Sequence, residues 1–352
     1  MNLRDVRDMD VAGKNVLFRV DFNVELNENR DVREKYKVES AKSTLDYLLS
    51  KGAKVALLTH LGRPDGKPDP AFSVRDIADD VERILAREVL FVDDCVGEKV
   101  ETALNGLGLD KVILLENVRF YSGDETNDSE FSQLLSRPFD IFVNGAFGVC
   151  HRDQASVTGV TRFLPSSAGI HLVDEVGHLT DARERPTRPA VAIIGGAKIE
   201  TKLPIIRMFE EKYDRVLVAG RVAGEAEDKK IPFSDKVLLP EDYASDRLDI
   251  GEKTIRRFRE EILGAKTVVW NGPLGKFENP EYAAGTNMVL ESIIESGAFS
   301  IVGGGETIIA LEEAGVFQKI SFVSTGGGAM LEFLSGEPLP GLLVLEGEDR
   351  IR

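Results

Sequence analysis

Four glycine-rich segments in the second half of the chain each follow directly on a short apolar run. Glycine lets the backbone approach an anion closely, and a helix that begins after such a turn offers unpaired N–H groups. One such turn is usually no more than a tight strand–helix connection, but four of them predict a phosphate ligand. The segments are residues 194–198 (IGGAK), 270–275 (WNGPLG), 302–307 (VGGGET) and 324–329 (STGGGA).

Lys198 and Lys202 follow the first of these segments and are four residues apart. On a helix this spacing places both side chains on one face. Beside an anion site they would neutralise phosphate charge, whereas elsewhere they would form an exposed basic face. The glycines immediately upstream favour the first interpretation.

Two familiar phosphate-transfer patterns are incomplete. Gly275 and Lys276 are followed by Phe277, so the P-loop pattern is absent. Residues 151–153 read HRD, but the asparagine of the protein-kinase catalytic loop does not follow. Neither fold is predicted.

Basic and polar residues follow the apolar runs of the first half. Arginine binds phosphate or carboxylate through two parallel hydrogen bonds. Each arginine alone would more often form a surface ion pair, but together these residues predict an anion pocket. Asp21 and Asn23 could orient a substrate hydroxyl, or Asp21 could pair with Arg19 instead. The basic residues are His60, Arg63, Arg119 and Arg152.

Short apolar runs alternate with helical patterns along the whole chain, which predicts parallel sheets covered by helices. Residues 163–188 carry no strand signal and contain two prolines, with Pro189 just beyond, so we place the connection between two domains there. We therefore expect two doubly wound, Rossmann-like α/β domains joined by a hinge helix, with a cleft between them. The expected strands lie at 16–20, 55–59, 89–92, 112–115, 141–143, 191–194, 216–218, 237–239, 268–270, 301–302 and 320–324.

Composition excludes several classes of protein. The 352 residues carry a net charge of -16, whereas a general nucleic-acid binder would be basic. The charged N-terminus does not resemble a signal peptide, and no apolar run could span a membrane. Cys95 and Cys150 form no metal-binding or disulfide pattern. We expect a cytoplasmic protein without nucleic-acid or membrane partners.

Together these motifs resemble those of phosphoglycerate kinases, in the order of that family and over nearly the whole chain. The resemblance implies reversible phosphoryl transfer between 1,3-bisphosphoglycerate and ADP, giving 3-phosphoglycerate and ATP, with Mg2+ as cofactor. It also implies a monomer whose two domains close on the substrates. The matching segments are FRVDFNV, HLGRP, LLENVRF, FVNGAFGVCHR, GGAKIETK, WNGPLGKFE, GGGET and STGGGA, from Phe18 to Ala329.

The resemblance also implies roles for individual residues. Those implied for 3-phosphoglycerate binding are Asp21, Asn23, His60, Arg63, Arg119 and Arg152. Those implied for the nucleotide are Gly195, Lys198, Lys202, Asn271, Pro273, Glu278, Gly303, Gly304, Gly305 and Thr307. Those implied for catalysis are Lys37, Lys202, Gly304 and Gly327, with Glu306 for the metal.

The implied domains are residues 1–168 for 3-phosphoglycerate, 169–188 as the connecting helix and linker, and 189–330 for the nucleotide. A tail, residues 331–352, is expected to return to the first domain. Two alternatives remain open at this point. One is a related phosphotransferase with another nucleotide or substrate preference, and the other is a catalytically weakened regulatory homologue.

Four departures from the family pattern motivate these alternatives. Lys37 stands where the family has a catalytic arginine, so the charge remains without the fork. Glu306 replaces an aspartate associated with the metal, and Gly145 replaces an aspartate near the substrate. Residues 218–224 contain fewer glycines than the family's adenine-site segment, and the following stretch is shortened.

Overall fold

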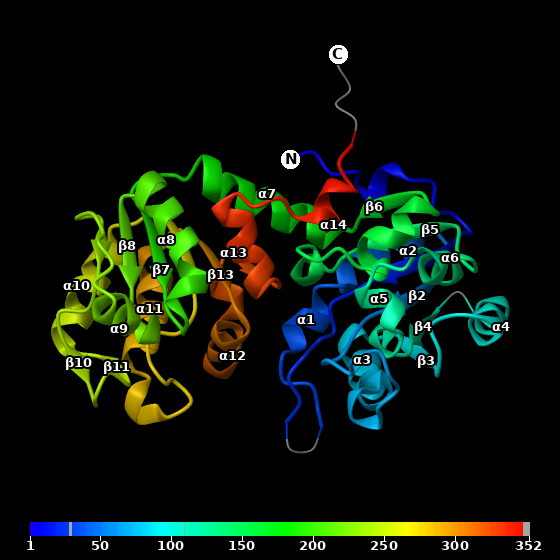
Figure 1. Cartoon of the computed structure of the whole chain (residues 1–352), viewed down its shortest axis with the longest axis horizontal. Helices are drawn as coiled ribbons and strands as arrows, with labels where there is room; N and C mark the ends of the chain where they lie inside the picture. The colour runs from blue at the N-terminus through cyan, green and yellow to red at the C-terminus, as the bar shows by residue number, and fades with distance from the viewer. Residues whose placement is uncertain (28–29, 109, 348–352) are drawn as a thin grey trace, which may run out of the picture. The chain divides into compact units, whose positions relative to one another are not determined.

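The computed structural model describes residues 1–27, 30–108 and 110–347, which divide into two compact units (Figure 1). The first unit comprises Met1–Val176 and the C-terminal segment from Pro338, and the second comprises Gly177–Glu337. The boundary falls inside helix α7 (Ile170–Glu184). The end of the expected tail, 348–352, lies outside the described residues. Within the described ranges, no helix combines the length and the apolar character needed to cross a bilayer.

The first unit is built on a six-stranded parallel sheet in the order β3-β4-β2-β1-β5-β6. Its strands are β1 (Asn15–Arg19), β2 (Lys54–Leu58), β3 (Glu88–Val92), β4 (Lys111–Leu115), β5 (Ile141–Asn144) and β6 (Ser166–Ala168). Its helices are α1 (Lys35–Glu39), α2 (Lys42–Ser50), α3 (Ala78–Leu85), α4 (Glu98–Gly106), α5 (Ser122–Glu125), α6 (Ser129–Ser136) and α14 (Pro340–Leu343).

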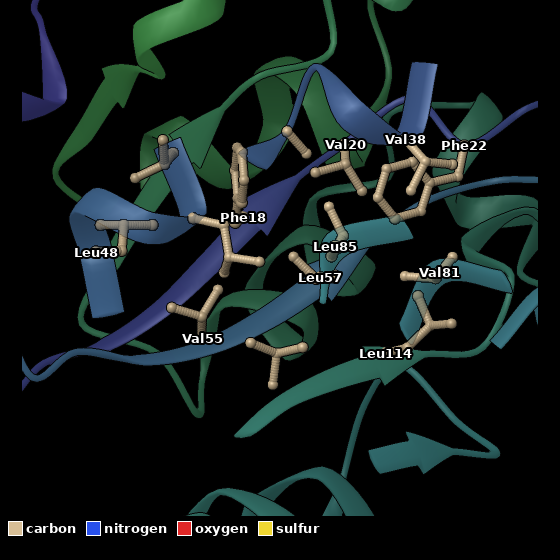
Figure 2. Close-up of a cluster of buried hydrophobic side chains, with 14 of the residues drawn as sticks. Phe18, Val20, Phe22, Val38, Leu48, Val55, Leu57, Val81, Leu85 and Leu114 are labelled. Atoms are coloured by element: carbon tan, nitrogen blue, oxygen red, sulfur yellow. The ribbon is translucent and has the colours of Figure 1, made fainter. Parts of the chain in front are cut away.

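Both faces of this sheet carry apolar side chains. Successive side chains of a strand point to opposite sides, so apolar neighbours in one strand lie on different faces. Phe18 of β1 packs into a cluster with residues of α2 and α3, including Leu48 and Leu85 (Figure 2). Leu17, its neighbour in β1, packs into a second cluster with residues of α4 and α6. The sheet is therefore held between two helical layers, which leaves its carboxyl edge free for function.

The second unit repeats this architecture with a parallel sheet in the order β14-β13-β12-β7-β8-β9. Its strands are β7 (Ala190–Ile194), β8 (Arg215–Val218), β9 (Val237–Leu238), β12 (Thr267–Asn271), β13 (Phe299–Gly303) and β14 (Phe322–Ser324). A short antiparallel pair, β10 (Tyr243–Ala244) and β11 (Asp249–Ile250), lies outside this sheet. The helices are α8 (Ile199–Lys212), α9 (Gly220–Asp228), α10 (Glu252–Leu263), α11 (Ala284–Ser296), α12 (Gly305–Ala314) and α13 (Gly327–Ser335).

The expectation that residues 163–188 contain no strand is wrong. Ser166–Ala168 form β6, which pairs in parallel with β5 at the edge of the first sheet. This strand has only three residues, all small and all buried. It lacks the β-branched run on which the strand prediction depended, so only its tertiary position reveals it.

The C-terminal segment packs within the first unit. Leu3 and Glu346 form an antiparallel bridge, and the N–H of Gly341 donates to the carbonyl oxygen of Cys150 at 2.8 Å. A Cβ atom on Gly341 would lie 2.9 Å from the Cα atom of Cys150. Glycine is therefore required where α14 meets the loop after β5.

Candidate functional site

In the first unit, the loops after β1, β2 and β4 meet at Gly62. The side-chain oxygen of Asn23, after β1, accepts a hydrogen bond from the N–H of Gly62 at 2.9 Å. Arg119, after β4, donates from Nη1 to the carbonyl oxygen of Gly62 at 2.8 Å. Because these strands are neighbours in the sheet, residues about 100 positions apart along the chain share one contact point.

The remaining predicted residues of this edge differ in their burial and in their contacts. Asp21 accepts a hydrogen bond from the N–H of Asn23 at 3.3 Å. Arg152, after β5, is half-buried, and its positive charge contributes to lowering the pKa values of His60 and Arg119. Arg63 is exposed next to Gly62 and forms no hydrogen bond or ion pair with the described residues.

The contacts of His60 determine which of its nitrogens carries the proton. Its Nδ1 lies 3.0 Å from Nη2 of Arg19. Because a guanidinium group can only donate, Nδ1 must accept, and the proton is on Nε2. Burial, together with the positive charges of Arg19 and Arg119, holds the pKa of His60 well below its ordinary value. The ring is therefore neutral, and its Nε2–H group is available to an anion.

Arg119 has more hydrogen-bond donors than the protein satisfies. Its Nε and Nη2 atoms are buried without a hydrogen-bond partner among the described residues. Glu125 lies 3.7 Å from Nε, beyond hydrogen-bonding distance. Burial and the charges of Arg152 and Arg19 lower the pKa of Arg119 to about 10. Unpaired buried donors are costly, and an anion bound here would supply the missing acceptors.

Lys37 lies at the same edge, on the short helix α1. Its ammonium group donates to the carbonyl oxygen of Asn23 at 3.0 Å and pairs with Oε1 of Glu34 at 3.0 Å. Burial works against the charged form, but the carboxylates of Asp21 and Glu34 outweigh it and raise the pKa of Lys37. The ammonium is therefore charged and fixed beside the segment from Asp21 to Asn23.

Arg19 is a residue of this edge that the sequence interpretation considered only as a partner of Asp21. It is fully buried, and it donates to the carbonyl oxygen of Leu58 and to Oγ of Ser156 as well as to His60. The available signal was a charged residue at the carboxyl end of an otherwise apolar strand. A charge in that position must be paired with other groups or with a ligand.

In the second unit, the loops after β7 and β12 are joined by backbone hydrogen bonds. The N–H of Gly195 donates to the carbonyl oxygen of Asn271 at 2.9 Å, and the N–H of Gly196 to that of Pro273 at 2.8 Å. A Cβ atom on Gly195 would lie 2.1 Å from the oxygen of Pro273. Gly272 has φ +92°, and a Cβ atom there would lie 2.5 Å from the backbone of Gly195. The close approach of the two loops therefore leaves no room for a side chain at Gly195 or Gly272.

The N-terminal ends of α12 and α13 lie side by side. A Cβ atom on Gly327, the first residue of α13, would be 3.4 Å from the Cα atom of Gly304, which precedes α12. Gly305 begins α12, and Oγ1 of Thr307 accepts from the N–H of Gly272 at 2.9 Å. Gly303 ends β13 with its Cα facing Met330. Two adjacent helix N-termini present unpaired N–H groups and partial positive charge to an anion.

The two lysines of this unit have different environments. Lys202 is half-buried and donates to the side-chain oxygen of Asn271. Burial lowers its pKa to about 8, against the opposing effect of Glu306. Lys198 is exposed and precedes α8 with φ +69°, a left-handed conformation that is costly for a residue with a side chain.

A pocket of about 370 Å3 opens among these loops. Its lining includes the predicted residues Pro273, Glu278 and Glu306. It also includes Leu248 and Arg221, the latter from residues 218–224, which stand in place of the family's adenine-site segment. Neither was assigned an individual role, although Arg221 directly follows Gly220 at the start of a helix after a strand.

Comparison with known proteins decides the family. The family model for phosphoglycerate kinase matches residues 6–225 and 225–337. The chain belongs to the phosphoglycerate kinase family. Phosphoglycerate kinases of Desulfosudis oleivorans and Rubrobacter xylanophilus are 38% and 39% identical to it, over 98% and 100% of this chain and 99% and 100% of theirs. The crystal structure of phosphoglycerate kinase from Pyrococcus horikoshii is 28% identical, with a TM-score of 0.87 over 97% of this chain and 98% of that one.

The structure explains one departure from the phosphoglycerate kinase pattern. A Cβ atom on Gly145 would lie 2.6 Å from the ring of Phe18. The aspartate expected at this position from the resemblance would therefore displace a fully buried core side chain. Glycine at position 145 thus leaves the space that the ring of Phe18 occupies in this chain.

Proposed function

We propose that the chain catalyses reversible phosphoryl transfer between 1,3-bisphosphoglycerate and ADP, giving 3-phosphoglycerate and ATP. The observation that carries the proposal is the buried cationic edge of the first unit, where Arg119 retains two unpartnered donor nitrogens. Such an edge is suited to a small, highly charged anion. The phosphate-type loops of the second unit supply the complementary nucleotide site.

The first unit would bind 3-phosphoglycerate through side chains. Arg119 would supply its free N–H groups, and neutral His60 would donate from Nε2. Arg63 and Arg152 would add positive charge at the rim, while Asp21 and Asn23 would accept from or donate to the substrate hydroxyl. We assign residues 1–168 and the returning tail to this function.

Residues 189–330, which lie within the second unit, would bind ADP or ATP largely through backbone groups. The pocket lined by Pro273 and Glu278 would hold the nucleoside, with Glu278 accepting from the ribose hydroxyls. Lys198 and Lys202 would neutralise phosphate charge, and Asn271 holds the Lys202 ammonium in place. The amides at the start of α12 and α13 would stabilise the phosphoryl group during transfer.

The residues present fit a magnesium ion that arrives with the nucleotide. Among the described residues, no group of three or more His, Cys, Asp and Glu side chains could hold a metal alone. Magnesium is typically bound by one or two carboxylates together with substrate phosphates, and Glu306 lines the nucleotide pocket. Glu306 would hold the ion, whose charge would offset that of the phosphates.

Catalysis would depend on position and charge, since phosphoryl transfer needs little covalent chemistry from the protein. We assign catalytic roles to Lys37, which is fixed at the edge of the first unit, and to Lys202 of the second unit. Each ammonium would offset negative charge on the transferring phosphoryl group. Exclusion of water would protect the acyl phosphate from hydrolysis. We further propose that the protein acts as a monomer in the cytoplasm.

A coupled assay with 3-phosphoglycerate, ATP and magnesium tests the proposal. We expect saturable turnover that requires all three components. Binding of both substrates without turnover would contradict the proposal and favour a regulatory homologue.

A further inference from the structure

Glu34 is a buried carboxylate beside Lys37 that no role assigned so far uses. Its side chain is 3% exposed, although an ionised carboxylate is rarely buried without partners. It is the N-cap residue of α1, directly before Lys35 and three positions before Lys37. This spacing puts the two side chains on one face of the first helical turn.

Both oxygens of Glu34 are occupied. Oε1 pairs with the ammonium of Lys37 at 3.0 Å, and Oε2 accepts a hydrogen bond from the N–H of Glu25 at 2.9 Å. The second contact ties the carboxylate to the segment that follows Asn23. Glu34 is therefore anchored at one end and directs Lys37 from the other.

The lysine has three N–H donors, of which Glu34 and the carbonyl oxygen of Asn23 each take one. A flexible four-carbon side chain would otherwise sample many rotamers, and a point charge has no fork to set its direction. Two fixed acceptors leave the third N–H with a defined orientation. An ammonium held in this way can serve a transferring phosphoryl group without reorganisation.

We infer that Glu34 is a positioning residue for phosphoryl transfer, which holds the ammonium of Lys37 in the orientation that stabilises the transferring group. The inference deepens the proposed function and rests on the role of Lys37 there. It also explains how lysine can serve at the position where the family resemblance led us to expect arginine: the neighbouring carboxylate supplies the orientation that a guanidinium fork would supply itself.

The test is a double-mutant cycle in the full chain. Glu34→Gln keeps the shape and removes the charge, and we expect kcat to fall about 10- to 100-fold, because small displacements of a catalytic group have effects of this size. The KM values for 3-phosphoglycerate and ATP should change less than about threefold, since the interaction is used mainly in the transition state. In a Lys37→Met background, Glu34→Gln should have no further effect on kcat.

Glu210→Gln is a matched control in the second unit. Glu210 pairs with a basic residue three positions away, Arg207, as Glu34 pairs with Lys37, and it also accepts a hydrogen bond from a backbone N–H, that of Ser234. Each variant removes the charge of a carboxylate that has two partners, so the change in its melting temperature reports the structural cost of that loss. We expect Glu210→Gln to leave kcat unchanged.

The outcomes separate the inference from the proposed function. An unchanged kcat in Glu34→Gln, or an equal loss in the wild-type and Lys37→Met backgrounds, overturns the inference alone. Full kcat in Lys37→Met overturns the role of Lys37 and the inference with it. If Glu34→Gln does not fold, Glu34→Asp retains a carboxylate one methylene shorter, and the same cycle with Lys37→Met decides. Its kcat should show an intermediate loss, and an unchanged kcat overturns the inference.

Discussion

The two units use the same sheet architecture to build opposite kinds of candidate anion site. At the carboxyl edge of the first sheet, buried side chains form the candidate site: Arg19 and Arg119 supply positive charge beside the neutral ring of His60, and Arg119 retains unsatisfied donors. At the carboxyl edge of the second, glycines bring backbone loops and two helix N-termini together. The first site is set by charge and side-chain geometry, and the second by the absence of side chains.

This difference predicts which kind of substitution should impair each candidate site. Loss of a charged side chain should weaken binding at the first edge, whereas addition of even one methyl group should disrupt the second. Lys202 is the exception, because it is a half-buried cation in a candidate site otherwise made largely of backbone. The following variants test this contrast, beginning with the largest expected effect.

Lys202→Ala should lower kcat by about 100- to 1000-fold, the usual cost of removing one donor from a preorganised transition-state site. Steady-state kinetics in the coupled assay would measure the change. Lys212→Ala is the control, because that lysine pairs with Glu184 at the surface. A kcat within about twofold of wild type would refute the assignment of Lys202.

Arg119→Met should raise the KM for 3-phosphoglycerate about 10- to 100-fold, as expected for loss of hydrogen bonds to a charged ligand. The KM for ATP should change little. Arg119→Lys keeps the charge without the fork and should recover only part of the loss. Full recovery with lysine would show that charge alone matters at this edge.

Gly195→Ala should destabilise the second unit by about 1–3 kcal/mol, because its methyl group would overlap the carbonyl oxygen of Pro273. Thermal melting with and without nucleotide would detect the loss. Gly106→Ala in α4 meets no atom within 4 Å and is the control. An unchanged melting temperature for Gly195→Ala would contradict the required close approach of the loops.

Nucleotide affinity should fall several-fold as the pH rises through about 8, where the free enzyme's Lys202 loses its proton. The ammonium attracts phosphate below this pH, and the neutral amine does not. Because the pKa of His60 lies well below its ordinary value, 3-phosphoglycerate binding should show no titration of this ring near neutral pH. Calorimetric titrations at pH values on both sides of 8 would show whether the two substrates differ in this way.

Gly145→Asp, which restores the family's residue, should lower stability by about 1–3 kcal/mol without raising kcat, because the side chain would overlap Phe18. Chemical denaturation would measure the stability change. A gain in kcat at unchanged stability would contradict this expectation and would show that the ring of Phe18 can move aside at little cost in free energy.

Much of this contrast was predictable from the sequence. Apolar runs bounded by glycine or charge indicated the central strands, and the turns at Gly195, Gly272 and Gly304 indicated a phosphate-binding edge. Short β6 was missed because Ser166–Ala168 have no apolar signature. Its pairing with β5 is decided by tertiary packing rather than by local preference.

The contacts between the side chains could not be predicted from the sequence. Nothing in the spacing of Arg19 and His60 shows that one fixes the tautomer of the other, because their contact arises from the pairing of β1 with β2. Likewise, Glu34 and Lys37 read as an ordinary helical ion pair. Only their burial and the anchoring by the N–H of Glu25 distinguish it from a surface pair.

The most direct test of the central claim is to measure binding of 3-phosphoglycerate and of magnesium–ADP to both Arg119→Met and Lys202→Ala by calorimetry. We predict a crossover: Arg119→Met loses affinity for 3-phosphoglycerate and retains it for the nucleotide, while Lys202→Ala shows the reverse. Parallel loss of both affinities in either variant would contradict the assignment of one substrate to each unit.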